Sequence, residues 1–255
     1  MIELNYKVYG QGEALIILHG LFGSLDNWVS HARSLAEDYS VYLLDQRNHG
    51  KSPHENDWNY PVMAEDLFEF MNQLGIYRAH LLGHSMGGKT VMEFARHYPE
   101  MIDKLIVADM TPKQYAPHHT EILETLISLD LSKLESRRDA KVKLEERIQD
   151  PSVIQFLLKS LGRDEEKSFR WKFNLQVIYD NYERVLDEIK FEDEVDLPTL
   201  FIHGGESPYL QEEDKSPIQE IFPEATFYKL EGAGHWVHAE KPAEFLTQIQ
   251  KYLAS

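Results

Sequence analysis

The segment around Ser85 limits the possible folds of this chain more than any other. An apolar run at residues 79–82 leads into Gly-His-Ser-Met-Gly at residues 83–87, and a helical pattern follows over residues 86–97. Glycines two residues before and two after the serine suit a turn in which strand and helix come so close that a Cβ atom would collide. We therefore predict a strand, a sharp turn and a helix, with the Ser85 hydroxyl held clear at the carboxyl end of a sheet.

This arrangement is typical of a nucleophile elbow, in which a strained backbone exposes a serine. A serine hydroxyl is a poor nucleophile at neutral pH, so it needs a general base and an acid that orients the base. His235 is the predicted base, because it lies in a glycine-rich loop at residues 232–236 that can reach across the strand ends. His238 is the alternative base, although it is better placed to begin the next turn.

The acid has two candidate positions. Asp109 ends the strand that follows the serine turn, where a carboxylate could hold the His235 imidazole in one tautomer and stabilise its charged form. A later loop, at residues 203–209, contains Glu206 and Ser207. We favour Asp109, with Glu206 as the competing acid and Ser207 as a hydrogen-bonding partner. A capping role in a turn is the alternative for Asp109.

The tetrahedral intermediate of acyl transfer needs backbone N–H donors at its oxyanion. The N–H of Met86, directly after the serine and at the start of a helix, is one predicted donor. The second is the N–H of Leu21 in the glycine-containing loop at residues 19–24, with Phe22 as the next choice. His19, in the same loop, is expected to stabilise the loop rather than to act as a second base.

Short apolar strands alternate with helical patterns along most of the chain. Buried strand patterns occur at residues 14–18, 41–44, 79–82, 105–108, 197–202 and 225–230. This alternation predicts an α/β fold with a mostly parallel, doubly wound sheet. An alternating stretch at residues 2–9 suits an antiparallel edge strand. Ligands of such sheets bind beyond the carboxyl ends of the strands.

The alternation stops between residues 112 and 196, where helical and charged patterns replace buried strands. We predict an inserted helical cap at residues 112–196 and a core domain formed by residues 1–111 and 197–255. A cap above the strand ends would shape the substrate pocket and limit the access of water. The candidates for lining this pocket are Phe22, Trp171 and Trp236.

The composition disfavours several classes of function. A net charge of −17 disfavours nucleic acid and anionic membranes as partners, and the absence of cysteine excludes disulfides and thiolate nucleophiles. No apolar run is long enough to span a membrane, and the first residues do not resemble a signal peptide, so the cytoplasm is the expected location. No metal or cofactor is expected. His118-His119 lacks an acidic ligand at a fixed spacing and is expected to be a solvated pair.

Three basic residues lie near the predicted site along the sequence. Arg47 is expected to pair with Asp45 within their loop. Arg47, Lys51 and Lys89 could alternatively meet a phosphorylated carrier such as coenzyme A.

Four segments carry a resemblance to a known family. They are LDQRNHG at residues 44–50, SPH at 52–54, GHSMGGK at 83–89 and GHWVHAE at 234–240. The chain resembles the α/β-hydrolase superfamily along essentially its whole length, and these segments are similar to YbfF-type bacterial esterases and their eukaryotic abhydrolase-domain relatives. The resemblance implies a serine esterase acting on acyl esters, with acyl-CoA thioesters as further candidate substrates. It also implies an acid at the earlier strand, matching Asp109, and a serine in the later loop, matching Ser207.

We therefore expect a carboxylic ester hydrolase that acts on a small-molecule substrate through an acyl-enzyme. A serine nucleophile at residue 85 argues against dehalogenases and epoxide hydrolases of this superfamily, which use aspartate. The alternatives are a carbon–carbon hydrolase or lyase with the same triad, and a ligand-binding homologue without turnover.

Overall fold

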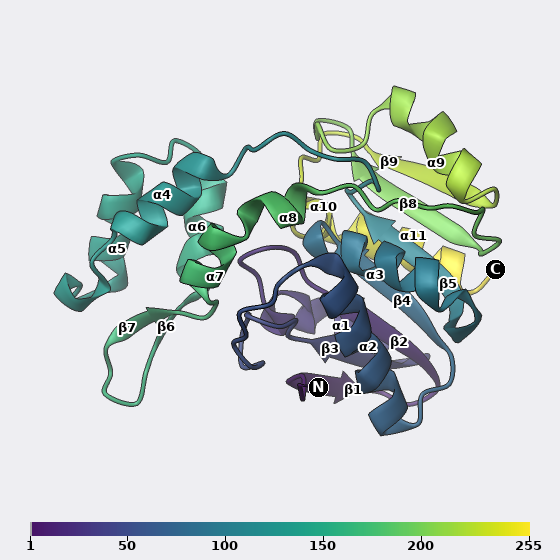
Figure 1. Ribbon diagram of the computed structural model, residues 1–255, viewed down its shortest axis with the longest axis horizontal. Coiled ribbons are helices and arrows are strands. Elements are labelled where there is room, and N and C mark those ends of the chain that lie inside the picture. The colour runs from purple at the N-terminus through teal and green to yellow at the C-terminus, as the bar shows by residue number, and fades with distance from the viewer. Residues whose placement is uncertain (1) are drawn as a thin grey trace.

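The computed structural model describes residues 2–255, and a seven-stranded sheet lies at its centre (Figure 1). The strands are β1 (Tyr6–Tyr9), β2 (Glu13–Leu18), β3 (Tyr39–Leu44), β4 (Ala79–His84), β5 (Ile102–Ala108), β8 (Thr199–Gly204) and β9 (Ala225–Leu230). Their order across the sheet is β1-β3-β2-β4-β5-β8-β9. Strand β1 is antiparallel to β3, and the other neighbouring pairs are parallel. The predicted mostly parallel sheet with an antiparallel edge is confirmed.

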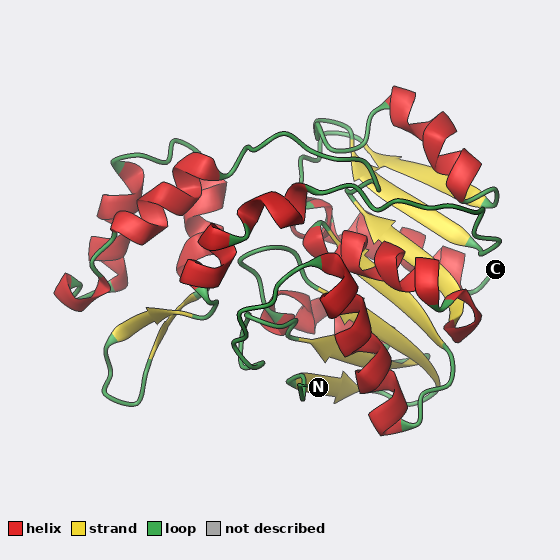
Figure 2. Cartoon of the chain, in the orientation of Figure 1, coloured by secondary structure: helices red, strands yellow, loops and turns green. Residues whose placement is uncertain are grey.

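Helices cover both faces of the sheet (Figure 2). One face of the sheet is covered by α2 (Tyr60–Leu74), α3 (Met86–His97) and α9 (Lys215–Ile221). The other face is covered by α1 (Val29–Leu35), α10 (Val237–Glu240) and α11 (Pro242–Leu253). Short 3-10 helices span Leu25–Trp28, Pro99–Met101 and Glu212–Asp214. In β2, Ile16 and Leu18 enter one apolar cluster while Leu15 and Ile17 enter the other, because successive side chains of a strand point to opposite faces.

Local signals in the sequence explain where α2 begins and ends. The Asn59 side chain accepts a hydrogen bond from the N–H of Val62, and Pro61 occupies the first turn, where its missing N–H costs nothing. Gly75 ends the helix with φ of 66°, a left-handed conformation that glycine adopts without strain. Within residues 2–255, no helix has both the length and the apolar character needed to cross a membrane.

Between β5 and β8 the chain leaves the sheet and forms an insertion at one end of it, on the left in Figure 1. The insertion contains α4 (Thr120–Ser128), a 3-10 turn at Leu131–Lys133, α5 (Arg137–Glu145), α6 (Pro151–Lys159), α7 (Leu175–Asp180), α8 (Tyr182–Leu186), and a hairpin of β6 (Leu161–Arg163) with β7 (Phe169–Trp171). The predicted helical insertion is confirmed. The hairpin was not predicted, because three-residue strands are too short to produce a recognisable alternation. The exact domain boundaries remain predictions.

The topology gathers four loops at one edge of the sheet. Ser85 follows β4, and Asp109 follows the neighbouring strand β5. The loop at residues 19–24 follows β2 on the other side of β4, and His235 lies in the loop after β9. Because these strands are parallel, their carboxyl ends lie at the same edge, which is where doubly wound sheets bind ligands.

Candidate active site

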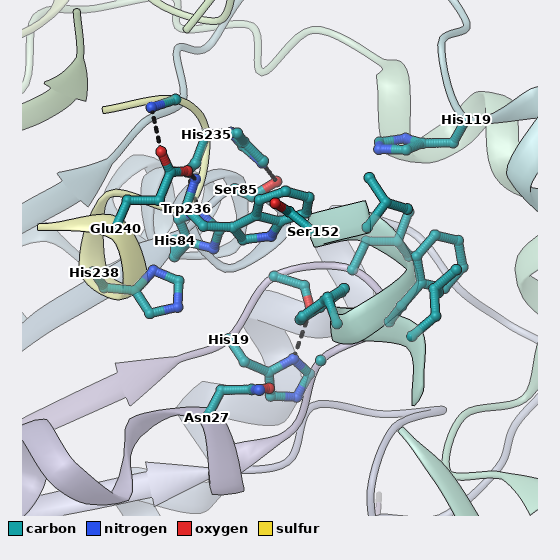
Figure 3. A pocket seen from close by; sticks show the side chains of 18 of the residues that line it. His19, Asn27, His84, Ser85, His119, Ser152, His235, Trp236, His238 and Glu240 are labelled. Atoms are coloured by element: carbon teal, nitrogen blue, oxygen red, sulfur yellow. Dashed lines mark hydrogen bonds between the residues drawn. The ribbon is translucent and has the colours of Figure 1, made fainter. Parts of the chain in front are cut away.

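Three side chains from three strand ends form a continuous chain of hydrogen bonds. Ser85 Oγ lies 3.0 Å from His235 Nε2, and His235 Nδ1 lies 2.7 Å from Asp109 Oδ2. Asp109 is fully buried, whereas His235 is partly exposed to the pocket. Figure 3 shows the serine hydroxyl and this imidazole facing each other at the pocket wall. The structure thus brings together the serine, histidine and acid that the sequence singled out.

The backbone is strained at two of these three residues. Ser85 has φ of 53° and ψ of −117°, and Asp109 has φ of 50°. Such conformations cost about 1–3 kcal/mol each and persist where the surroundings hold them. A Cβ on Gly83 would lie 2.1 Å from the carbonyl oxygen of Gly87, which is the predicted collision of strand with helix. A Cβ on Gly87 would instead meet the carbonyl oxygen of Leu18, at the end of β2.

Three donors hold the Asp109 carboxylate. The N–H of Gly204 donates to Oδ1 at 2.9 Å, and the Ser207 hydroxyl donates to Oδ2 at 2.5 Å, beside the His235 ring. Glu206, the competing acid, is exposed and lies at the rim of the pocket without a hydrogen bond to the imidazole. The structure therefore pairs His235 with Asp109 and leaves Glu206 apart from them.

Two further side chains position the loop that carries His235. The Glu240 carboxylate accepts hydrogen bonds from the N–H groups of Gly234 at 2.8 Å and Trp236 at 3.1 Å. The His84 ring donates from Nε2 to the carbonyl oxygen of His235 at 2.9 Å. Burial and the nearby His235 lower the pKa of His84 to about 3, so this ring is neutral at neutral pH. Neither role was predicted from the sequence. His84 lies 151 residues from His235 along the chain, and the contacts of Glu240, although local, depend on the conformation of the loop.

His238, the alternative base, is buried away from Ser85. Its ring stacks on Trp28 with centroids 4.4 Å apart, and burial lowers its pKa well below the ordinary value. Within residues 2–255, no hydrogen bond joins this ring to Ser85. The structure therefore brings His235 rather than His238 to the serine.

His19 fixes the loop after β2 through both ring nitrogens. Nδ1 donates to the carbonyl oxygen of Gly20 at 2.8 Å, and Nε2 accepts from the N–H of Gln46 at 3.1 Å. Burial lowers the pKa of His19 to about 4, which is consistent with this neutral tautomer. The ring thus stabilises its loop, as the sequence predicted, and has no nitrogen free to act as a base.

Two backbone N–H groups beside Ser85 have no acceptor among residues 2–255. They belong to Leu21, in the loop after β2, and to Met86, the first residue of α3. The N–H of Phe22, the other candidate oxyanion donor, donates to Nε2 of His49 at 3.3 Å. Leu21 and Met86 are therefore available for a ligand, whereas Phe22 is already engaged.

Ser85 lies between two cavities of different size. The outer chamber has a volume of about 440 Å³, and its walls include Phe22, Val153, Phe156, Trp236 and His235. The inner chamber has a volume of about 20 Å³, and its walls include Tyr60, Met86, Tyr115, Tyr182, Val185 and Leu186. Both chambers are lined by the same five residues, which are Leu21, Ser85, His118, His119 and Tyr209. Figure 3 shows Ser85 between the loop of His235 on one side and His119 on the other.

Trp171 does not lie at either chamber, so the prediction that it lines the pocket is wrong. Its ring stacks on Phe173, with centroids 5.5 Å apart and planes 12° apart, inside the apolar cluster of the insertion. Phe22 and Trp236, the other two candidates, are in the wall of the outer chamber.

The predicted solvated pair is right for His118, which is exposed, but not for His119, which is only partly exposed. His118 Nε2 bonds to the hydroxyl of Tyr209, and His119 Nδ1 lies 3.1 Å from the hydroxyl of Tyr182. Burial lowers the pKa of His119 to about 3. Within residues 2–255, no three His, Asp or Glu side chains are grouped so that they could hold a metal ion. The pair therefore forms part of the wall between the chambers.

The predicted pairing of Asp45 with Arg47 is also wrong. Arg47 forms two hydrogen bonds, of 2.5 and 2.7 Å, with Asp66 of α2, and both side chains are buried. Asp45 instead accepts from the N–H groups of Leu25 and Lys51 at 2.8 and 2.9 Å. The Arg47 guanidinium bonds to both oxygens of Asp66, which is the strong two-point form of this pair, whereas the Asp45 carboxylate is already engaged by backbone N–H groups.

Lys89 joins the two ends of the insertion. Its side chain is fully buried, and Nζ donates to the carbonyl oxygens of Lys113 at 2.8 Å, Leu186 at 3.4 Å and Asp187. The ammonium also lies 5.0 Å from the centre of the Tyr115 ring. Burial lowers the pKa of Lys89 to about 7. This side chain is therefore occupied structurally.

The predicted contact of basic residues with a phosphorylated carrier is not supported. The walls of the inner and the outer chamber include none of these three residues, Arg47, Lys51 and Lys89. Arg47 pairs with Asp66, and Lys89 donates to backbone carbonyls, so neither side chain has a free charge to offer a phosphate.

Comparisons with known proteins agree with this architecture. The model of the alpha/beta hydrolase fold family matches residues 13–242. The chain is 42% identical to a Haemophilus influenzae protein whose name describes an esterase/lipase, over 98% of this chain and 88% of that protein. It is 40% identical to Esterase YbfF of Escherichia coli, over 94% and 92% of the two chains. A solved structure described as a marine microorganism esterase has a TM-score of 0.96 and 40% identity, covering 99% of this chain and 100% of that one. The chain therefore belongs to the α/β-hydrolase family and is a hydrolase of the esterase/lipase type.

Proposed function

We propose that this protein hydrolyses carboxylic esters through an acyl-enzyme, with Ser85 as the nucleophile, His235 as the base and Asp109 as the acid. The observation that carries the proposal is the pair of hydrogen bonds, of 3.0 and 2.7 Å, that links these three side chains. In this arrangement the imidazole takes the serine proton as the oxygen attacks. The buried carboxylate then stabilises the imidazolium and holds its tautomer.

Each step of the reaction has a group in place. Ser85 Oγ attacks the ester carbonyl carbon, and its proton passes to His235 Nε2. The imidazolium then gives this proton to the alcohol oxygen as the carbon–oxygen bond breaks. Water next attacks the acyl carbon and gives a proton to His235, which returns it to Ser85 as the acid leaves. The products are one carboxylic acid and one alcohol for each water consumed.

The N–H groups of Leu21 and Met86 are the proposed oxyanion donors. Both lack an acceptor within residues 2–255 and lie beside Ser85, and Met86 begins α3, whose N-terminal dipole favours negative charge. The hydrogen bond from Phe22 to His49 supports Leu21 as the donor from this loop. Ser207 is proposed to orient the Asp109 carboxylate through its 2.5 Å hydrogen bond.

The charge of the outer chamber supports an uncharged ester as the substrate. Asp150, Glu206 and Glu240 are in its wall, and within residues 2–255 no lysine or arginine is. Together with the net charge of −17, this acidic rim would repel the phosphates of coenzyme A. We therefore propose small neutral acyl esters as substrates in preference to acyl-CoA thioesters. A thioester with an uncharged leaving group fits the same chemistry.

Residues 112–196 are proposed to act as a cap over a core formed by residues 1–111 and 197–255. The insertion supplies walls to both chambers, with Val153 and Phe156 in the outer one and Val185 in the inner one. A pocket closed in this way would shield the acyl-enzyme from bulk water and select the substrate by shape.

The test compares Ser85→Ala with Ser152→Ala, a matched change of another serine in the outer chamber. We expect Ser85→Ala to lower kcat on p-nitrophenyl acetate by at least about a thousandfold, because the nucleophile is lost, and Ser152→Ala to stay within about threefold. A fluorophosphonate probe should label the parent and Ser152→Ala but not Ser85→Ala. Full ester hydrolysis by Ser85→Ala would overturn the proposal.

A further inference from the structure

We propose that the inner chamber holds the acyl group of the substrate and the outer chamber its alcohol. The preferred substrates are then esters that join a short, apolar acid, such as acetic or propionic acid, to a larger uncharged alcohol. This inference rests on the proposed function, because it assigns the two sides of a carbonyl that Ser85 attacks.

The position of the general acid decides which group occupies which chamber. The imidazolium must protonate the leaving alcohol, so the alcohol oxygen has to lie within hydrogen-bonding reach of His235. His235 lines the outer chamber and is absent from the wall of the inner one. The Tyr209 ring stacks on His235 with centroids 4.0 Å apart, and it lines both chambers, so it separates the imidazole from the inner chamber. The alcohol must therefore extend into the outer chamber, which leaves the inner chamber for the acyl group.

The size of the inner chamber limits the length of the acyl group. Its volume of about 20 Å³ is little more than the roughly 10–15 Å³ that a cavity needs to hold one water molecule. The methyl of an acetyl group or the ethyl of a propionyl group fits this space. A longer chain would press against close-packed walls. The outer chamber, with about 440 Å³, has room for a much larger alcohol.

The tyrosines of the inner chamber explain why the acyl group should be apolar. The Tyr60 hydroxyl donates to a backbone carbonyl of α8 at 2.7 Å, and the Tyr115 hydroxyl donates to the carbonyl of Tyr209 at 2.9 Å. The Tyr182 hydroxyl accepts from the N–H of His119 at 2.8 Å. Each hydroxyl is thus already bonded within the protein. A hydroxyl or carboxylate on the acyl chain would lose its bonds to water without comparable replacement.

Two series of esters test the assignment in the parent enzyme. The first varies the acid, from p-nitrophenyl acetate to propionate, butyrate, hexanoate and octanoate. The second keeps acetate and varies the alcohol, from ethyl to hexyl and 2-phenylethyl acetate, with acid release followed by titration. We expect kcat/KM to fall about tenfold or more between propionate and hexanoate, because added methylenes have no space. Along the second series kcat/KM should stay level or rise.

A matched pair of valine substitutions assigns the chambers directly. Val185 is in the wall of the inner chamber and Val153 in that of the outer one. Val185→Ala should raise the ratio of butyrate to acetate turnover about fivefold, because it enlarges the acyl site, whereas Val153→Ala should leave this ratio unchanged. Leu186→Val, a smaller truncation of the same wall, should shift the ratio in the same direction if Val185→Ala does not fold.

The outcomes separate this inference from the proposed function on which it rests. Equal kcat/KM for hexanoate and acetate, abolished by Ser85→Ala, would overturn the chamber assignment while leaving the serine esterase in place. A butyrate ratio that shifts in Val153→Ala and not in Val185→Ala would have the same meaning. If no ester of either series were hydrolysed in a way that depends on Ser85, the proposed function and the assignment would both be overturned.

Discussion

Different kinds of contact hold together the catalytic corner and the insertion. The catalytic corner consists of Ser85, Asp109 and His235 with the supporting residues His84, Ser207 and Glu240. Its members meet through directed hydrogen bonds between side chains and loops of different elements. The insertion instead packs leucine, isoleucine, valine and aromatic side chains into one apolar cluster.

This difference separates the chemistry from the choice of substrate. Proton transfer needs atoms held near 3 Å from each other, and hydrogen bonds provide that precision. Apolar packing tolerates moderate changes in side-chain size and shape, usually at a cost below about 1.5 kcal/mol for volume-conserving exchanges. Substitutions in the corner should therefore change the rate for every ester, whereas substitutions in the insertion should change which ester is preferred.

The largest expected effect comes from Asp109→Asn. The amide cannot stabilise the imidazolium and favours the wrong tautomer of His235, so kcat should fall by about a thousandfold to ten-thousandfold for every ester. Asp150→Asn is the matched control, since this residue lies in the outer chamber and its Asn form can still cap α6. Initial rates on a short and a long ester would show the loss. A loss confined to one ester would contradict the separation of the two regions.

Acid should destabilise the protein through the histidines buried around the corner. Burial lowers the pKa of His19 to about 4 and that of His49 and His84 to about 3, whereas an unfolded histidine titrates near 6.5. Below pH 6.5 the unfolded chain thus binds more protons than the folded one. The free energy of unfolding should fall as pH falls from 6.5 toward 4, by up to about 1.4 kcal/mol per pH unit for each histidine.

Urea unfolding at pH 7.5 and pH 5, for the parent and two variants, measures this contribution. His49→Gln should reduce the loss of stability between the two pH values, because one buried titrating group is gone. His97→Gln, a change at a half-exposed ring, should leave the loss as it is in the parent. An equal loss in all three proteins would show that the buried histidines do not cause it.

Lys89→Met tests the attachment of the insertion to the sheet domain. The change leaves the carbonyls of Lys113, Leu186 and Asp187 without their donor, and we expect it to lower the free energy of unfolding at pH 7 by about 2 kcal/mol and to raise KM. Burial lowers the pKa of Lys89 from 10.5 to about 7, so between these values the folded protein binds fewer protons than the unfolded chain. The contribution of this residue to stability therefore rises as pH rises from 7 toward 10.5.

Urea unfolding at pH 7 and pH 9.5 follows the difference in stability between the parent and Lys89→Met. This difference should widen at the higher pH, and a narrower difference would contradict the lowered pKa. Hydrogen exchange at residues 113–119 should become faster in the variant, because the start of the insertion loses its anchor.

The smallest expected effect is that of Glu240→Gln. One of its two hydrogen bonds to the loop of His235 is lost, which corresponds to about 1 kcal/mol and to roughly a fivefold fall in kcat. Glu244→Gln, on the exposed side of α11, is the control and should not change the rate. A change in KM alone, with kcat unchanged, would argue against a positioning role for Glu240.

The sequence was most informative where one local pattern imposes one geometry. The order of strands and helices, the elbow at Ser85 and the distance along the chain to His235 all follow from short motifs, and the structure brings these residues together. Asp109 was also identified, because it ends a strand next to the elbow strand.

The sequence was least informative about partners that lie far apart in the chain. Arg47 pairs with Asp66 rather than with Asp45, and nothing in a local window indicates this choice. Trp171 turns into the apolar cluster of the insertion instead of the pocket, because the hairpin that carries it was not predicted. The support of His235 by Glu240 and His84 depends on loop conformations, which periodicity does not encode.

The contacts of Lys89 have a consequence for how the enzyme could diversify. The carbonyl oxygens of Lys113 and Leu186 lie within 2.8 and 3.4 Å of the same nitrogen, so the chain departs from the sheet domain and returns to it at almost the same place. A segment whose two ends meet can be shortened, lengthened or exchanged without moving the flanking strands. We therefore expect that other segments grafted between the same two anchor points, in place of residues 114–185, would keep the hydrolytic machinery while changing the molecules it accepts.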